Sequence, residues 1–170
     1  MKKILKKQTE EGYLVVNIET ENNYFSITGE IWKNKKSYYD NYDRNLMTCG
    51  CIHDEILEHF PELKIIVDLH LSDIDGLPMH AIENGFYYYE IMNGTARYHH
   101  AEPGDAEKYR RVLCEHLRIT EKELSFILIS LHDSDTTEGK KIIFSNHVNK
   151  LLPKWKDEAD RALKYIEELP

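Results

Sequence analysis

The sequence lacks any long hydrophobic run. No stretch of its 170 residues approaches the ~18 consecutive apolar residues of a membrane-spanning helix. The start, residues 1–7, carries four lysines and has neither the apolar run nor the cleavage site of a signal peptide. Because 41% of the residues are apolar, a chain of this length can bury a core of ordinary size. We therefore expect one cytoplasmic domain, residues 1–170, without a membrane segment.

Cysteine is scarce, with only Cys49, Cys51 and Cys114 present. An odd number of cysteines in a chain without an export signal argues against a disulfide framework and favours reduced thiols. Two of the three cysteines are one residue apart. That spacing favours a shared set of ligands over a bridge between distant elements.

Familiar catalytic motifs are missing as well. The chain contains no Gly-rich phosphate loop, no Gly-x-Ser-x-Gly elbow, no His-Glu-x-x-His helix and no deaminase signature. It also has no internal repeat, no low-complexity tract and no linker that would divide it. The sequence therefore assigns no catalytic residue and no organic cofactor site.

Positive charge is in short supply. The formal net charge is −8, with +3 on residues 1–10, −9 on residues 11–100 and −2 on residues 101–170. Direct nucleic-acid binding is not expected, because phosphate contacts reward lysine and arginine. The acidity favours a basic protein partner, since opposite potentials steer encounter. The plainer interpretation is that the charge only keeps the protein soluble.

The N-terminal part, residues 11–48, is β-rich. Residues 13–20 and 24–32 are rich in β-branched and aromatic side chains, and the polar residues between them predict a hairpin. The segment 37–45 mixes three tyrosines with polar residues, which indicates a loop or an edge strand rather than a core strand.

Helical signals begin at His53 and dominate the rest of the chain. Residues 53–60 and 79–93 predict helices, whereas 62–71 fits either a buried strand or a helix. The stretch 104–169 is expected to be helical throughout, as 104–118, 120–131 and 138–169, with a break or kink at Pro153. Thr120 and Glu123 form a capping-box signature, and residues 132–135 predict a polar turn.

The strongest feature is a cluster of metal-binding residue types within residues 49–95. Six of the nine histidines lie between His53 and His100, and the run Cys49-Gly-Cys51-Ile-His53 compresses three ligand types into five residues. Gly50 permits the backbone to curl around an ion there. His70 and His80 bracket a turn that can return both imidazoles to the first group. Thiolate with imidazole selects zinc over magnesium or calcium.

Four ligands complete a structural zinc site, and the sequence offers five. Our first choice is Cys51, His53, His70 and His80, with Cys49 as the substitute if geometry excludes His53. The alternative is that the cysteines are small buried hydrophobes and the histidines ordinary residues. The spacing matches no standard zinc finger. The predicted fold is α+β: an N-terminal β-hairpin or small antiparallel sheet packed on a mainly helical C-terminal part, with the Cys/His site at the junction.

Several segments resemble small accessory proteins of phages and mobile elements in Gram-positive bacteria, and among these the metal-binding anti-CRISPR proteins that act on type II-A Cas9. The resemblance covers residues 24 to 90 and lies in four runs: Cys51-Ile-His-Asp-Glu-Ile56, Phe60-Pro-Glu-Leu63, Leu69-His-Leu-Ser-Asp-Ile-Asp-Gly-Leu-Pro-Met-His-Ala81 and Asn84-Gly-Phe-Tyr87. It implies a protein that is not an enzyme but a stoichiometric Cas9 inhibitor, which blocks the engagement of target DNA in the cytoplasm of the bacterial host cell.

Electrostatics is compatible with that expectation. Cas9 holds nucleic acids in positively charged channels, and an acidic surface can compete for them. The residues expected on that surface are Asp40, Asp43, Glu58, Glu62, Asp68 and Glu83. Two alternatives stay open: a metal-dependent hydrolase acting on nucleic acid or a nucleotide signal, with Glu55 or Asp73 as general base, and a phage structural or regulatory module. Asp73 and Asp75 are otherwise expected to be turn residues beside Gly76, the alternative being that they accept hydrogen bonds from a ligand imidazole.

Overall fold

A computed structural model describes most of the chain, in two compact units. The first unit combines Met1–Ile74 with Trp155–Pro170, and the second is Asp75–Lys154. The division falls inside the predicted segment 49–95, and the expectation of one domain stays a prediction. The described residues are 1–22, 24–42, 44–45, 49–70, 72–74, 76–94 and 105–170, with only the backbone described at 44–45, 49–51 and 72–73.

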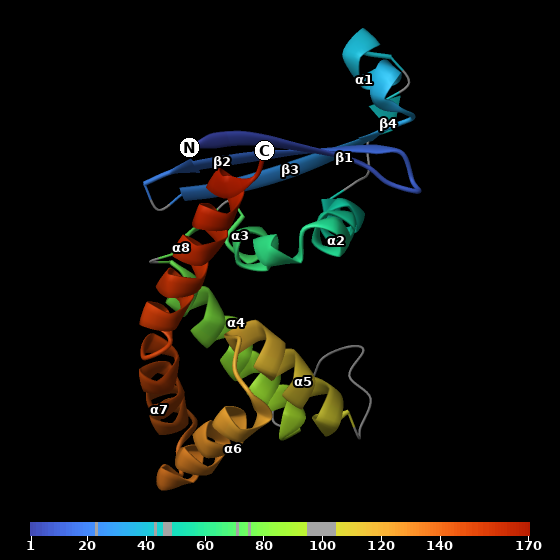
Figure 1. Cartoon of the computed structure of the whole chain (residues 1–170). Coiled ribbons are helices and arrows are strands. Elements are labelled where there is room, and N and C mark those ends of the chain that lie inside the picture. Colours follow the sequence, from blue (N-terminus) through green and yellow to red (C-terminus); the bar gives the residue numbers. More distant parts are fainter. Residues whose placement is uncertain (23, 43, 46–48, 71, 75, 95–104) are drawn as a thin grey trace. The chain divides into compact units, whose positions relative to one another are not determined.

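The first unit is built on an antiparallel sheet (Figure 1). Its long strands are β1 (Lys2–Gln8), β2 (Tyr13–Glu21) and β3 (Tyr24–Trp32), which pair in that order. Two short strands, β4 (Arg44–Asn45) and β5 (Ser72–Asp73), both pair with β3. The predicted hairpin is confirmed as β2 and β3. The basic start of the chain adds a strand at the sheet edge.

Both faces of the sheet are covered at the start of β2, where Tyr13, Leu14, Val15 and Val16 are all buried. Side chains alternate between the faces of a strand, so Leu14 and Val16 point to one side and Tyr13 and Val15 to the other. On the second face Tyr13, Val15 and Trp32 form their own apolar cluster. Four consecutive buried residues therefore indicate a strand between two layers.

The helices of the first unit are α1 (Lys35–Asp40), α2 (Cys49–His59), the 3₁₀ turn η1 (Pro61–Leu63), α3 (Lys64–Asp68) and α8 (Leu152–Glu168), whose residues from 155 onward belong to this unit. In Figure 1, α2 and α3 lie along one face of the sheet. The expectation of a loop or edge strand over 37–45 is wrong for 37–40, which belongs to α1. The ambiguous segment 62–71 is largely helical.

α1 forms because one side chain caps it and another anchors it. Asn34 accepts a hydrogen bond from the Ser37 backbone N–H at 2.9 Å, a standard N-cap. Tyr38 packs on the second-face cluster, with its ring 5.4 Å from Trp32 and 5.8 Å from Tyr13. The Lys6 ammonium lies 4.9 Å from the Tyr38 ring centre, a cation–π contact.

The second unit contains helices only among its described residues. These elements are α4 (Leu77–Met92), α5 (Ala106–Leu117), α6 (Glu121–Ser130), the 3₁₀ turn η2 (Leu131–Asp133) and α7 (Thr137–Asn149). The predicted helices over 79–93, 104–118 and 120–131 are confirmed, as is the polar turn at 132–135. The predicted helix over 138–169 is present as α7 and α8, with the expected break near Pro153.

Each unit has its own apolar core. In the second unit α4 meets α7 at Gly85, where a methyl group would lie 3.0 Å from the Phe144 ring. The last helix, α8, is amphipathic, because Trp155, Ala159, Ala162 and Ile166 form a buried stripe along it. The architecture is thus α+β, an N-terminal sheet followed by a mainly helical part. Along the described residues no helix is long and apolar enough to cross a membrane.

Candidate functional site

Two of the five predicted zinc ligands lie side by side. His53 is half-buried on α2, and His70 follows α3, where its backbone bridges to Phe25. Their ring centres are 5.5 Å apart and the rings meet edge to face. The first unit therefore places next to each other two imidazoles that are 17 positions apart in sequence.

The other three candidates are placed differently. Cys49 and Cys51 belong to the first turn of α2, and their side chains lie outside the described part of the chain. The predicted curl of the backbone at Gly50 is wrong, because residues 49–52 are already helical. His80 is exposed on α4 and belongs to the second unit.

His70 already uses one ring nitrogen. Its Nδ1 accepts a hydrogen bond from the Ile27 backbone N–H at 2.9 Å, so the neutral ring carries its hydrogen on Nε2. Burial, with the neighbouring His53 ring, lowers the pKa of His70 and keeps this neutral form. A metal can bind His70 only if the ring gives up the Ile27 bond or the Nε2 proton.

Within the described residues, no group of three or more His, Cys, Asp or Glu side chains is placed to hold a metal ion. A structural zinc site needs four ligands, and the described part supplies the pair His53 and His70. The thiols of Cys49 and Cys51 fall outside that part. The zinc site at the junction is thus not seen among the described side chains, and the ligand set stays a prediction.

The hydrolase alternative depends on Glu55 or Asp73 as general base, and the structure places the Glu55 side chain. The Glu55 carboxylate lies 3.1 Å from His59 Nε2, one turn along α2, and both side chains are largely buried. Asp73 pairs with Tyr24 through the backbone of β5, and its side chain lies outside the description, as does Asp75. Glu55 is therefore engaged with His59.

The predicted acidic surface divides. Glu58, at the end of α2, and Glu62, in η1, are exposed and four residues apart. Asp68 pairs with the lysine one turn before it at 2.5 Å, so its charge is partly neutralised. The other three are separated: Asp40 ends α1 on the opposite face of the sheet, Asp43 lies outside the described residues, and Glu83 belongs to the second unit. We call the exposed pair Glu58 and Glu62, which are four residues apart in sequence, the acidic patch.

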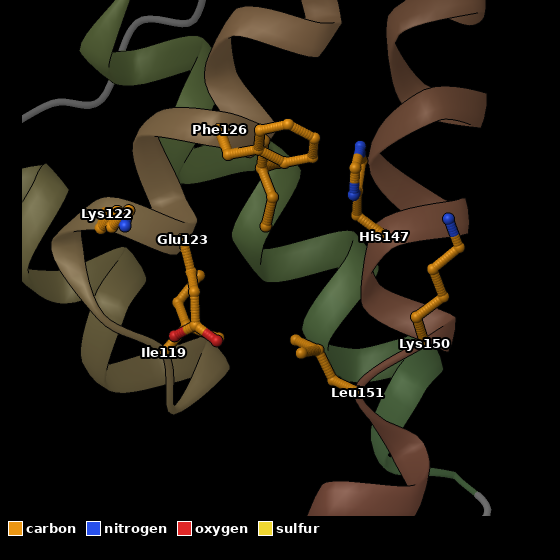
Figure 2. Close-up of a pocket in the computed structure, with 8 residues that line it drawn as sticks. Ile119, Lys122, Glu123, Phe126, His147, Lys150 and Leu151 are labelled. Atoms are coloured by element: carbon orange, nitrogen blue, oxygen red, sulfur yellow. The ribbon is translucent and has the colours of Figure 1, made fainter.

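The second unit contains an apolar groove between α6 and α7, with a volume of about 500 Å³ (Figure 2). Its apolar lining comes from the α5–α6 connection, from α6 and from the turn between α7 and α8. Phe126 stands at the rim, 68% exposed, and Ile129, one turn further along α6, is also 68% exposed. The apolar lining residues are Ile119, Phe126, Ile127 and Leu151, and the polar ones are Lys122, Glu123, His147 and Lys150. We call this the α6/α7 groove.

His147 faces Phe126 across the groove (Figure 2), with ring centres 6.0 Å apart. Its Nε2 lies 2.8 Å from Ser130 Oγ, and the Ser130 hydroxyl donates to the Ile127 carbonyl at 2.6 Å. Because the serine has one hydroxyl hydrogen, His147 Nε2 is the donor to Ser130. This arrangement is the reverse of an activated nucleophile, where the hydroxyl donates to the imidazole. Burial and then Lys150 lower the pKa of His147, so the ring is neutral.

The charged side chains that line the groove carry a net positive charge. Glu123 belongs to the capping box, and its carboxylate accepts from the Thr120 N–H at 2.7 Å and the Thr120 hydroxyl at 2.9 Å. These bonds, with the nearby Lys154, lower the pKa of Glu123. Lys122 and Lys150 are exposed and form no ion pair within the part of the chain that the structure describes. The groove is therefore apolar inside with two available ammonium groups at its border.

Our sequence interpretation did not identify this groove, although a signal was present. Five of the seven residues from Leu124 to Ser130 are apolar. A helix that buries one stripe cannot cover so many apolar side chains, and the surplus must face outward.

No family model, no curated protein and no solved structure matches this chain. The features that bear on its function are therefore those of its own sequence and structure.

Proposed function

We propose that this protein acts by stoichiometric binding of a partner protein, and that the partner is a type II-A Cas9, as the resemblance implies. The observation that carries the proposal is the α6/α7 groove with its exposed rim. Folded proteins rarely expose contiguous apolar surface unless it serves an interaction. Phe126 and Ile129 fit such a role, because exposed aromatic and aliphatic anchors carry much of the energy of protein interfaces.

The acidic patch supports the choice of partner. Glu58 and Glu62 are exposed on α2 and η1 of the first unit, and Glu62 also forms a hydrogen bond with Tyr165. Carboxylates can occupy the positive channels in which Cas9 holds its guide and target strands. Interactions of this type are screened by salt, so the inhibition is expected to weaken as ionic strength rises.

A catalytic function has less support. The Ser130 hydroxyl donates its hydrogen bond to the Ile127 carbonyl and not to His147, and the Glu55 carboxylate is engaged with His59. A hydrolytic zinc site also needs an open coordination position next to a free general base. Binding without chemistry is the function that these side chains favour.

A structural zinc ion at the start of α2 is the second part of the proposal. Cys49, Cys51 and His53 lie within five consecutive positions, and His70 stands beside His53. Binding through His70 Nδ1 has to displace the Ile27 N–H. Zinc is therefore expected to change the NMR resonance of the Ile27 amide in apo protein, whereas magnesium at the same concentration leaves it in place.

The function is tested by titrating the protein against a fixed concentration of guide-loaded Cas9 and measuring target cleavage. The expected curve ends near one equivalent and shifts to weaker inhibition at higher salt. A matched pair of charge reversals, Glu58→Lys with Glu62→Lys against Glu10→Lys with Glu11→Lys, separates a local acidic contact from net charge. Full inhibition at far below one equivalent, growing with time, is the result that contradicts a binding mechanism.

A further inference from the structure

We infer that the α6/α7 groove receives an amphipathic α-helix of the partner protein, with carboxylates flanking its apolar stripe. This inference rests on the proposed binding function and specifies the site and the chemistry of the bound segment. It draws on three observations in the second unit: the walls of the groove, the line of its exposed apolar side chains and the charge at its border.

The walls select a helix over an extended segment. The two walls are α6 and α7, and their backbone N–H and C=O groups form hydrogen bonds within each helix. A β-strand laid between them would find no backbone partners there, and its own polar groups would be buried unpaired. An α-helix satisfies its backbone internally and presents only side chains. A groove with helical walls therefore favours a helical ligand.

The exposed apolar side chains run along α6 in the direction of such a helix. Phe126 and Ile129 are one turn apart on α6 and both 68% exposed, and Phe126 lines the groove together with Ile127 of α6 and with Leu151 on the α7 side. Apolar residues at i, i+3, i+4 and i+7 of a partner helix can follow this line. The volume of about 500 Å³ lies in the range of protein sites that receive large apolar groups.

The charged residues at the border of the groove favour an acidic ligand. Lys122 stands at the start of α6 and Lys150 just after the end of α7, so both border the groove. The one carboxylate there, Glu123, is held by the Thr120 cap and lies near Lys154. Two positive groups remain to pair with a ligand, and opposite charge at the rim of an interface steers its partner.

The test uses synthetic peptides of about 16 residues, long enough to form a helix when bound. One carries leucines at i, i+4 and i+7 with glutamates flanking them; the second replaces each glutamate by lysine; the third is the first with a central proline. Fluorescence anisotropy measures the binding of each labelled peptide to the full-length protein. We expect the glutamate peptide to bind at least about tenfold more tightly than either of the others.

Matched variants connect binding to the groove. Phe126→Ala is expected to weaken the glutamate peptide about tenfold or more, while Ile142→Ala, an apolar residue 54% exposed on α7 outside the lining, leaves binding unchanged. Reversing Lys122 and Lys150 to glutamate is expected to exchange the preference between the two charged peptides. The equivalent reversal of Lys35 and Lys36, on α1, is the control.

Three results overturn the inference: equal binding of the glutamate and lysine peptides, equal binding of the proline peptide, or no effect of Phe126→Ala. A fourth is a dimer in sedimentation that Phe126→Ala dissociates, since a second copy then covers the groove. The Cas9 titration separates this inference from the proposed function. Inhibition that survives Phe126→Ala rejects the groove but keeps the function, whereas peptide binding without Cas9 inhibition keeps the groove and rejects Cas9 as the partner.

Discussion

Replacing Gly29 by alanine is expected to destabilise the first unit, because this glycine lets α2 approach β3. A methyl group at Gly29 would lie 2.6 Å from Ile52 Cγ1 and 3.1 Å from both Ile52 Cδ1 and Ile56 Cδ1. Carbon atoms in cores prefer about 3.5–4.0 Å, so α2 must shift by about 1 Å or Ile52 must leave its rotamer. Overpacking of this kind costs about 1–3 kcal/mol, and the loss of glycine freedom in the unfolded chain offsets about 0.4–1 kcal/mol. The net expected loss of unfolding free energy is about 1–2 kcal/mol.

A double-mutant cycle isolates the crowding. Ile52→Ala alone is expected to cost about 2–5 kcal/mol, since the side chain is 5% exposed. In the double variant the new methyl group occupies part of the space that Ile52 vacates. The loss of unfolding free energy in the double variant is therefore expected to be about 1–2 kcal/mol smaller than the sum of the losses in the two single variants. Gly29→Ala combined with Val15→Ala is the control. Val15 is buried on the opposite face of the sheet, and those two changes are expected to add.

Tryptophan fluorescence during urea unfolding is the assay, because Trp32 and Trp155 are the only tryptophans and both belong to the first unit. A midpoint that falls with an unchanged denaturant slope reports a change in stability. If Gly29→Ala unfolds at the wild-type midpoint, or if the Gly29 and Ile52 changes add within about 0.5 kcal/mol, the packing of α2 on β3 is not as described. His53 lies on α2, so the same packing also sets the distance between the two histidine rings.

Three further predictions concern single side chains. The pKa of His147 is lowered in the folded protein, so stability is complete above about pH 6.5 and falls as the pH drops below it; His147→Gln is expected to flatten this decline in circular dichroism melts. Thr120→Ala removes the cap of α6 and is expected to cost about 0.5–2 kcal/mol in urea unfolding followed by circular dichroism, whereas Thr120→Ser retains most of it. Elemental analysis is expected to find zinc in wild type and in Cys114→Ser but less in Cys51→Ser, and equal zinc in both variants rejects Cys51 as a ligand.

The elements that the sequence predicted well are those with local signals. The capping box at Thr120 and Glu123, the hairpin between residues 20 and 24, and the break near Pro153 all depend on residues within a few positions of one another. Such signals act through backbone geometry and short-range hydrogen bonds, so they survive in any tertiary setting.

The missed elements depend on distant partners. β1 contains four lysines among its seven residues, a composition that does not favour a strand. It forms a strand because it pairs along its whole length with β2. α1 has the composition of a loop, yet Tyr38 finds a cluster of Tyr13, Val15 and Trp32 to pack on. Tertiary contacts override weak local preference in both cases.

The two candidate sites differ in the same way. Clustering in sequence singled out His53 and His70 as candidates, and the structure places their rings next to each other because α2 and the end of α3 pack on the same sheet. The α6/α7 groove depends on which face of α6 its neighbours bury, so the surplus of apolar residues at 124–130 indicates an exposed apolar surface but not its location. The helical start of α2 was missed because Gly50 and the two cysteines have weak helix propensity.

The division into two units gives each site its own reporter. A change at the start of α2 acts in the unit that holds both tryptophans, whereas Phe126→Ala acts in a unit that has none. A chelator that removes a structural zinc is therefore expected to lower the tryptophan unfolding midpoint, and Phe126→Ala to leave it unchanged. Inhibition of Cas9 that is lost with Phe126→Ala while the tryptophan midpoint is retained assigns the contact to the helical unit. The reverse pattern, inhibition lost on chelation but not with Phe126→Ala, assigns it to the sheet unit and its acidic patch.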